Sequence, residues 1–415
     1  MLSRVYIQNV RSCADIELRD LGLMTVLVGR NGAGKTNILR TIEEAAKTAV
    51  GQGDFLLNFS PLFPTGTASA PESAVEFEFA ADDHQFKYRQ TNHLYQSRPQ
   101  AGANRAAPAW NVELSERLEY RTSDMLQGSA WRLIFERKGE LIRIGDGTTE
   151  LQIAARAAAL PAILSLLPKE DDRLRVLQPV LNFLSSIHYY PLDEPNLMAV
   201  GGSSDFVRQG DYLQWLKTRN IANYSTVVMR LIHMSLEKRE QFDLLKHLLG
   251  KNGLDIISDI DVHQLPIANQ APKPTDPANT FYYPLFKPSH SREKDWKPYS
   301  QMSFGTRRLL RIVASLLHDD SKVALIEQPE DGIHPGLLHK IIPLMKSNLD
   351  SSQILMSSHA PAVFNRLEPQ EIRIVEMDQG ITQLRPLNSK EIEGARKFMM
   401  EDGPLADFIE GITGD

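Results

Sequence analysis

Residues 29–36 read Gly-Arg-Asn-Gly-Ala-Gly-Lys-Thr and complete the phosphate-binding pattern G-x-x-x-x-G-K-[ST]. The apolar run at 23–28 predicts a buried parallel strand before the loop, and residues 37–46 predict a helix after it. Strand, glycine-rich loop and helix in this order are the context that the pattern requires, which disfavours an ordinary turn with a chance lysine. The sequence therefore predicts a loop whose backbone N–H groups and helix N-terminus bind a chain of phosphates.

The side chains of this loop predict what it binds. Lys35 can reach the β- and γ-phosphates of a nucleotide, and the Thr36 hydroxyl can bind Mg²⁺. We therefore expect ATP and Mg²⁺ as the ligands. The other nucleotide-binding positions that we predict in this segment are Asn31, Gly32, Ala33, Gly34 and Asn37.

Composition limits the class of protein. The 415 residues suffice for about two to three domains, and an apolar fraction of 42% with a charged fraction of 24% is ordinary for a soluble chain. Cys13 is the single cysteine, so no intramolecular disulfide can form, which fits a cytoplasmic setting. Neither a signal peptide nor a membrane span is expected. The net charge of −6 gives no overall attraction to DNA, so contact with DNA would need a local basic patch.

The first 150 residues predict a β-rich segment around the phosphate-binding loop. Short strands are expected at 5–7 and 16–18, and a half-exposed strand at 74–80, where apolar and acidic residues alternate. The runs at 131–136 and 141–144 predict a hairpin.

No acidic residue occurs between Asp83 and Glu113, and this stretch contains Lys87, Arg89, Arg98 and Arg105. It is either a mobile basic loop that contacts nucleic acid or, more commonly for such a run, a solvated loop.

The middle of the chain changes to helical periodicity. Apolar residues follow helical spacing at 154–167, 212–216 and 227–249. Residues 269–277 are rich in Pro and Ala and predict a linker or exposed loop.

A second apolar strand, at 323–327, ends in acidic residues. A buried strand that brings a carboxylate beside a phosphate-binding loop is the Walker B arrangement, in which the acid holds Mg²⁺ or its water. Glu327 is the candidate for that acid.

Two further segments flank this strand. Ser303 and Gly305 open a predicted helix, and a helix N-terminus of this kind binds anions. His359 follows a strand-like run at 354–358, at the sheet edge where ligands of α/β proteins bind. Each feature is weak alone, but their order after the phosphate-binding loop is that of ABC-type ATPases.

The chain thereby resembles a known group, the AAA/ABC-type ATPases of the RecF, SMC and OLD branch. The matching segments are Asn-Val-Arg-Ser at 9–12, the loop at 29–37, Glu-Gln-Pro-Glu-Asp-Gly-Ile-His-Pro at 327–335, and Ser-Ser-His-Ala-Pro at 357–361. The Pro-Glu-x-x-Ile/Leu-His-Pro run is characteristic of OLD-like members.

This resemblance implies an α/β fold, an ABC-type P-loop NTPase head with a mixed β-sheet, flanking helices and a helical insertion between the halves of the head. On this basis we expect the N-terminal half of the head at 1–150, a helical insertion that binds a partner at 151–250, and the C-terminal half at 251–415.

The family also implies a head-to-tail dimer, or a higher homo-oligomer, that encloses two ATP molecules. Ser303 and Gly305 would contact the γ-phosphate held by the other subunit. His359 would be the switch histidine, Glu327 the Mg²⁺-associated acid, and residues 331–332 the loop that reports across the interface.

The sequence departs from the family at two points. Gln328 stands where a catalytic glutamate usually follows the Walker B acid, and a glutamine can orient water but is not a useful base. Hydrolysis should then be slow or need help from Glu330. Gln328 is either natural or a substitution that traps ATP.

The stretch after His359 is too short for the nuclease domain of OLD proteins, so any nuclease is expected on a separate chain.

The leading interpretation is an ATP-dependent oligomerising switch that controls a separate effector, such as a nuclease, as in anti-phage systems; the effector is inferred by analogy. The alternative is a RecF-like repair ATPase that binds DNA directly, for which Arg307, Arg308 and Arg311 and the basic stretch would supply charge. Those arginines could instead stabilise their helix or face ATP. A transporter subunit or a small-molecule kinase fits the motif order poorly.

Overall fold

The computed structural model describes residues 1–53, 72–96, 110–122, 130–145, 149–191, 205–218, 226–266, 280–292, 295–348 and 352–413. The strands in these ranges are β1 (Leu2–Val10), β2 (Cys13–Arg19), β3 (Met24–Val28), β4 (Ser73–Ala81), β5 (His84–Gln96), β6 (Trp110–Thr122), β7 (Arg132–Lys138), β8 (Leu141–Ile144), β9 (Thr149–Gln152), β10 (Ile187–Tyr190), β11 (Val207–Arg208), β12 (Ile257–Pro266), β13 (Thr280–Pro288), β14 (Lys297–Pro298), β15 (Val323–Glu327), β16 (Gln353–Ser358), β17 (Ile372–Asp378) and β18 (Ile381–Pro386). The helices are α1 (Lys35–Ala49), α3 (Ala159–Leu166), α4 (Arg173–Ser185), α5 (Gln209–Thr218), α6 (Thr226–Glu237), α7 (Arg239–Leu249), α8 (Phe304–His318), α9 (Pro335–Asn348), α10 (Pro361–Phe364), α11 (Ser389–Glu401) and α12 (Leu405–Thr413), with short 3₁₀ turns at Tyr299–Gln301 and Pro369–Glu371.

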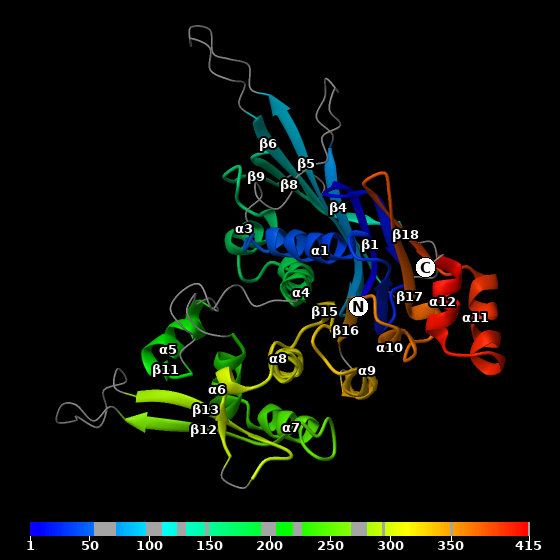
Figure 1. The fold of residues 1–415 in the computed structure, drawn as a ribbon. Helices are drawn as coiled ribbons and strands as arrows, with labels where there is room; N and C mark the ends of the chain where they lie inside the picture. The colour runs from blue at the N-terminus through cyan, green and yellow to red at the C-terminus, as the bar shows by residue number, and fades with distance from the viewer. Residues whose placement is uncertain are drawn as a thin grey trace, which may run out of the picture.

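Two large sheets organise these elements. One has eight strands in the order β2-β1-β4-β5-β6-β7-β8-β9 and is antiparallel throughout. The other is the central sheet, in the order β10-β15-β16-β3-β17-β18, in which the first five strands are parallel and β18 is antiparallel. Figure 1 shows β5 and β6 extending at one end of the molecule, while α5–α7 with β12 and β13 lie at the other.

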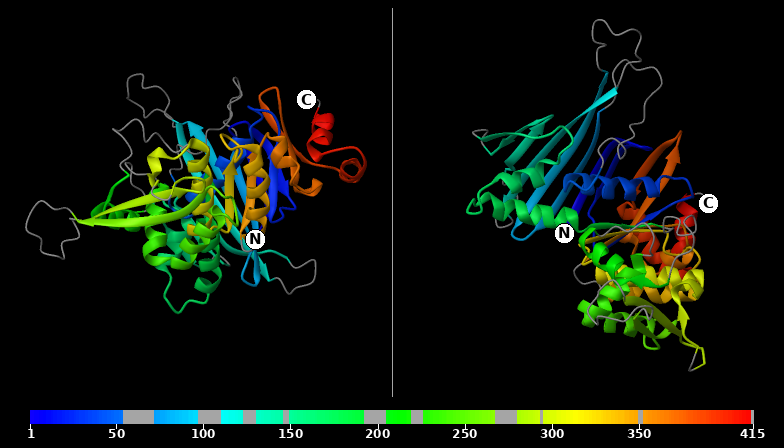
Figure 2. Two further views of the ribbon diagram at one scale, coloured as in Figure 1. Left: turned by 60° about the horizontal axis from the view of Figure 1, so that its bottom comes forward. Right: turned by 90° about the vertical axis from the view of Figure 1, so that its left-hand side faces the viewer.

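The central sheet is buried on both faces, which explains its short, continuous apolar strands. Along β3, Val26 packs into one hydrophobic cluster with α6, α8 and α9, and its neighbour Leu27 packs into another with α1 and the eight-stranded sheet. Alternating side chains of a strand point to opposite faces, so the central sheet is the shared layer between two cores. The right-hand view of Figure 2 shows the cyan and teal strands of the eight-stranded sheet apart from the green and yellow helices α5–α8. The predicted mixed α/β class is confirmed.

Most strands expected near the N-terminus are confirmed, including those at 5–7 and 16–18 and the hairpin formed by β7 and β8. The expectation that residues 74–80 form a half-exposed strand is wrong in one respect. β4 is a strand, but even Glu76 is only 8% exposed. The Arg4 guanidinium on β1 pairs with both Glu76 and Glu78, whose side chains are 11% and 24% exposed, so the acidic side chains of β4 are paired and largely covered rather than freely solvated.

The basic stretch beyond Asp83 is not a loop where the structure describes it. Lys87 and Arg89 lie on β5. Their side chains pair with acidic residues of β4, at 3.4 Å from Lys87 Nζ to Glu78 and 3.5 Å from Arg89 Nη1 to Glu76. Arg98 and Arg105 lie outside the described residues, as does the expected linker at 269–277.

The middle of the chain contains helices in the segments where periodicity predicted them, α3, α5, α6 and α7. It also contains α4 and several strands that periodicity did not predict. β10 pairs in parallel with β15 and therefore belongs to the central sheet. β12 and β13 form a long antiparallel pair that packs on α6 and α7. The division of the chain near residues 150 and 250 stays a prediction. Within the described ranges, no helix has the length and apolar character needed to cross a membrane.

A fully buried ion pair joins two strands of the eight-stranded sheet. Arg137 Nη1 on β7 lies 2.7 Å from Glu116 Oε2 on β6, and both side chains are 0% exposed. The Tyr88 hydroxyl and the Ala159 N–H also donate to this carboxylate, at 2.7 and 3.1 Å. Burial raises the pKa of Glu116, and the neighbouring guanidinium opposes that rise. The pair joins the sheet to the start of α3.

Replacing Arg137 with Met should destabilise the fold by about 3–5 kcal/mol, because it leaves the buried Glu116 carboxylate without its cation. Urea unfolding followed by circular dichroism measures this change. Arg143→Met is the matched control, since Arg143 pairs with Glu150 at an exposed position and should cost at most about 1 kcal/mol. Equal costs for the two variants would contradict the assigned role of the pair.

Candidate functional site

The phosphate-binding loop joins β3 to α1 as the sequence predicts, and its glycines are required by close backbone approach. A Cβ on Gly29 would lie 2.0 Å from the Val375 carbonyl oxygen of β17. Gly34 has φ +99°, and a Cβ there would lie 1.9 Å from Thr382 Oγ1 of β18. Side chains at these positions would push the loop away from the sheet. The loop is therefore seated directly on β17 and β18.

Lys35 occupies the interior of this loop. Its side chain is buried, and Nζ donates to the carbonyl oxygens of Gly29 and Arg30 at 2.5 and 2.8 Å. Burial lowers the pKa of the Lys35 ammonium, and the nearby Glu330 carboxylate opposes that effect. Two backbone carbonyl oxygens of the loop thus hold the ammonium in place, at a position from which a loop lysine can bind phosphate oxygens.

Thr36 and Glu327 meet at the carboxyl ends of β3 and β15. The Thr36 hydroxyl donates to Glu327 Oε1 at 2.5 Å, and Glu327 is 7% exposed. A hydroxyl and a carboxylate are the oxygen ligands that Mg²⁺ uses in proteins. In the part of the chain that the structure describes, no group of three or more His, Cys, Asp and Glu side chains could hold a metal. The Thr36 hydroxyl and the Glu327 carboxylate fit Mg²⁺, because this ion usually takes one or two protein oxygens and keeps water and phosphate as its other ligands.

The second oxygen of Glu327 has a partner that the sequence did not reveal. The Tyr189 hydroxyl, on β10, donates to Glu327 Oε2. Arg40 of α1 in turn donates from Nε to that hydroxyl at 3.2 Å. Burial raises the pKa of Tyr189, so the phenol stays protonated. No sequence signal marks Tyr189, because its contact with Glu327 depends on the pairing of β10 with β15, which only the fold establishes.

Gln328 directly follows Glu327 and has a strained backbone, with φ +39°. Its N–H donates to the Ser357 carbonyl at 3.0 Å, and its Nε2 lies 3.4 Å from Asn31 Oδ1 of the phosphate-binding loop. Backbone strain in a residue other than glycine concentrates at functional sites. The side chain of Gln328 thus points to the phosphate-binding loop.

Arg308 on α8 fixes this strained segment. Its Nη2 donates to the Glu327 carbonyl at 2.8 Å and to the Gln328 carbonyl. Arg308 is 3% exposed. The sequence left open whether the arginines of this helix contact DNA, stabilise the helix or face ATP. The structure shows a different contact for Arg308, which holds the backbone of the Walker B segment.

Glu330 and His359 are joined by hydrogen bonds. Glu330 Oε1 accepts from Ser358 Oγ and from the His359 N–H, both at 2.8 Å, and lies 3.3 Å from His359 Nδ1. The Glu330 side chain is 6% exposed and that of His359 is 44% exposed. The loop after β15 is therefore tied to the residue that follows β16.

Ser303 and Gly305 lie at the start of α8, as predicted. Ser303 Oγ caps the helix by accepting from the Thr306 N–H at 3.2 Å. A Cβ on Gly305 would lie 2.4 Å from the Gly332 carbonyl oxygen, so this turn packs on the loop that follows the Walker B strand. Phe304, between them, is 49% exposed.

The structure thus brings Asn31, Lys35, Thr36, Glu327 and Gln328 together at one edge of the central sheet. Asn37 Nδ2 donates to Ser12 Oγ at 2.8 Å and so anchors the loop to the turn between β1 and β2. The remaining predicted residues lie in the loop itself (Gly32, Ala33 and Gly34), beside it (Glu330 and His359), or on the neighbouring turn of α8 (Ser303 and Gly305). The roles of all these residues stay predictions.

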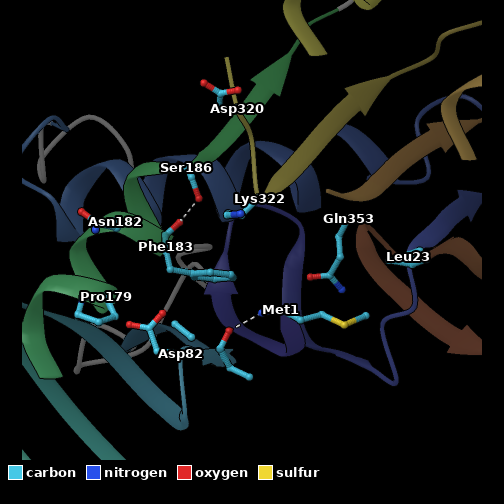
Figure 3. Close-up of a pocket in the computed structure, with 12 residues that line it drawn as sticks. Met1, Leu23, Asp82, Pro179, Asn182, Phe183, Ser186, Asp320, Lys322 and Gln353 are labelled. Carbon is cyan, nitrogen blue, oxygen red and sulfur yellow. Dashed lines mark hydrogen bonds between the residues drawn. The ribbon is translucent and has the colours of Figure 1, made fainter. Parts of the chain in front are cut away.

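A cavity of about 640 Å³ lies elsewhere, at the opposite edge of the sheet (Figure 3). Its lining includes Leu23, Lys322 and Gln353, which stand at the amino ends of β3, β15 and β16. Ligands of parallel sheets bind at the carboxyl ends of the strands, where Thr36 and Glu327 lie. The cavity is therefore separate from the candidate nucleotide site.

Residues 230–365 match the family described as "AAA domain, putative AbiEii toxin, Type IV TA system". No curated protein gave a significant match. Similar solved structures include an SMC head bound to the C-winged helix domain of ScpA (13% identity, TM-score 0.48, covering 94% of this chain and 99% of that chain). Others are an SMC head domain from Thermotoga maritima (13%, 0.42, 93% and 99%) and an Smc head domain with an extended coiled coil bound to the C-terminal domain of ScpA, derived from Pyrococcus furiosus (14%, 0.47, 96% and 98%).

The family match spans about a third of the chain and includes α8, β15, β16 and His359. The phosphate-binding loop lies outside it and joins the matched part through the central sheet. Residues 230–365 are therefore similar to an AAA domain.

Replacing Lys35 with Ala should weaken ATP binding by about 100-fold, because it removes the charged donor inside the loop. Calorimetric titration with Mg²⁺ and a non-hydrolysable ATP analogue measures the affinity. Lys47→Ala is the control: Lys47 lies on the last turn of the same helix, 47% exposed and paired with Glu43. If Lys35→Ala keeps the wild-type affinity, the site is misplaced.

Proposed function

We propose that this chain is an ATP-binding switch that assembles with a second copy of itself through bound Mg·ATP and hydrolyses ATP slowly. The observation that carries this proposal is the convergence of Lys35, Thr36 and Glu327. A buried lysine within a glycine-rich loop, a hydroxyl and a buried carboxylate supply the groups that position the phosphates and the metal.

The exposed turn at the start of α8 supports the assembly part of the proposal. Ser303 and Phe304 are solvent-exposed, although this turn contains the residues that the family resemblance assigns to nucleotide binding. In the family, the equivalent turn completes the site of the other subunit. A head-to-tail dimer would therefore bring Ser303 and Gly305 of one copy to the γ-phosphate held by the other.

Gln328 supports slow turnover. Its side chain lies beside Asn31 of the phosphate-binding loop, at the position where the family resemblance places a catalytic glutamate. The amide of a glutamine cannot accept a proton from water at neutral pH. Slow hydrolysis would keep the ATP-bound assembly in place for long periods, as a sensor requires and a fast motor does not.

We assign the chain to the OLD-like branch on the Pro-Glu-Asp-Gly-Ile-His-Pro run at 329–335. We further propose that it is the sensor or scaffold of a defence complex whose effector, such as a nuclease, is a separate protein. The description of the matched family, which names a toxin of a toxin–antitoxin system, is in line with such a role.

The dimer can be tested by measuring mass in solution. Light scattering after gel filtration should show a doubling of mass, or a larger multiple, when Mg²⁺ and a non-hydrolysable ATP analogue are present. Lys35→Ala should stay at the mass of the nucleotide-free protein. A wild-type mass that is unchanged by nucleotide would rule out assembly through ATP.

Replacing Gln328 with Glu should raise the rate of ATP hydrolysis by about 100-fold, because it supplies a general base at the position beside Asn31. Phosphate release at saturating Mg·ATP measures the rate. Gln383→Glu, which adds the same charge at an exposed position of β18, should leave the rate unchanged. No increase for Gln328→Glu would mean that another group activates the water.

A further inference from the structure

The Tyr189 hydroxyl occupies a position that no sequence motif marks. It lies at the carboxyl end of β10, between the Walker B strand and the helix of the phosphate-binding loop. It donates its one proton to Glu327 Oε2 and accepts a hydrogen bond from Arg40 Nε at 3.2 Å. The Arg40 guanidinium also lies 5.8 Å from the centre of the Tyr189 ring. One hydroxyl therefore connects α1, β10 and β15.

Both oxygens of Glu327 are consequently held by hydroxyl groups. Thr36 donates to Oε1 and Tyr189 donates to Oε2, from opposite ends of the carboxylate. Two donors on different elements fix the plane and the rotation of the carboxylate, which a single donor would leave free to turn. Groups of this kind, one step removed from a metal, orient its ligands and raise its affinity.

The next residue on β10 offers a chemically identical comparison. Tyr190 points to the other face of the sheet, where its hydroxyl lies 3.1 Å from Asp319 Oδ2 and 2.8 Å from Ser321 Oγ. Asp319 also accepts two hydrogen bonds from Arg230 of α6, at 2.8 and 2.6 Å. Removal of the Tyr190 hydroxyl thus disturbs the same strand without touching Glu327.

We propose that Tyr189 is a positioning residue for the magnesium ion of bound Mg·ATP and acts through the Glu327 carboxylate. This inference rests on the proposed nucleotide function. Tyr189 does not touch the nucleotide; it holds the acid that receives the metal or its water. Arg40 supports it by fixing the orientation of the hydroxyl.

The test compares the affinity for a non-hydrolysable ATP analogue with Mg²⁺ and with EDTA, measured by calorimetry. The dissociation constant in EDTA divided by the dissociation constant with Mg²⁺ reports how strongly the metal strengthens nucleotide binding. Tyr189→Phe should lower this ratio about tenfold, with the affinity in EDTA unchanged. Tyr190→Phe should keep the wild-type ratio. The affinity for Mn²⁺ in the presence of the analogue can be measured by electron paramagnetic resonance. It should fall in Tyr189→Phe and stay at the wild-type value in Tyr190→Phe.

Three results would overturn the proposal: an unchanged ratio in Tyr189→Phe, an equal loss in Tyr190→Phe, or a loss in EDTA as large as the loss with Mg²⁺. Thermal unfolding without nucleotide checks that each variant is folded. If Tyr189→Phe does not fold, Arg40→Met carries the test, since it keeps the phenol and should lower the ratio by a smaller factor. Wild-type protein that binds no nucleotide would refute the proposed function instead.

Discussion

The parallel pairing of β15, β16 and β3 is the constraint on which the candidate site depends. Thr36 and Glu327 are separated by most of the chain, yet their side chains meet because β3 and β15 both pair with β16. Parallel strands present their carboxyl ends at one edge, so the groups that follow each strand converge there. His359 and Gln328 reach the same edge by the same rule.

One short segment, residues 328–332, is held from three sides. Arg308 holds the Gln328 carbonyl, Ser358 and the His359 N–H hold the Glu330 carboxylate, and Gly305 packs on Gly332. The first and third of these contacts come from the same helix, α8. A displacement of α8 would therefore shift both ends of the segment together. This geometry links the exposed turn at Ser303 to the strained backbone beside Glu327.

The sequence alone was sufficient to predict the elements whose formation depends on neighbouring residues. The phosphate-binding loop, α1, the Walker B strand and the cap at Ser303 each depend on a few consecutive residues, and the structure has these elements where they were predicted. It was insufficient where a residue acts through a distant partner. Tyr189 is part of a short run that periodicity does not distinguish from its helical surroundings, and its role depends on β10 pairing with β15. Similarly, alternation along β4 suggested solvent on one face, because nothing local shows that Arg4 pairs with Glu76.

The order of strands in the central sheet also has a consequence for biosynthesis. β3 is made near the start of the chain, whereas its two neighbours, β16 and β17, are made after residue 350. At translation rates of about 5–20 residues per second, β3 waits for its partners for roughly 15–70 seconds. The antiparallel sheet from β1 to β9 is complete much earlier and buries Leu27 and the apolar face of α1 from one side. In the nascent chain, the other face of β3 would therefore stay uncovered until β16 and β17 have been made.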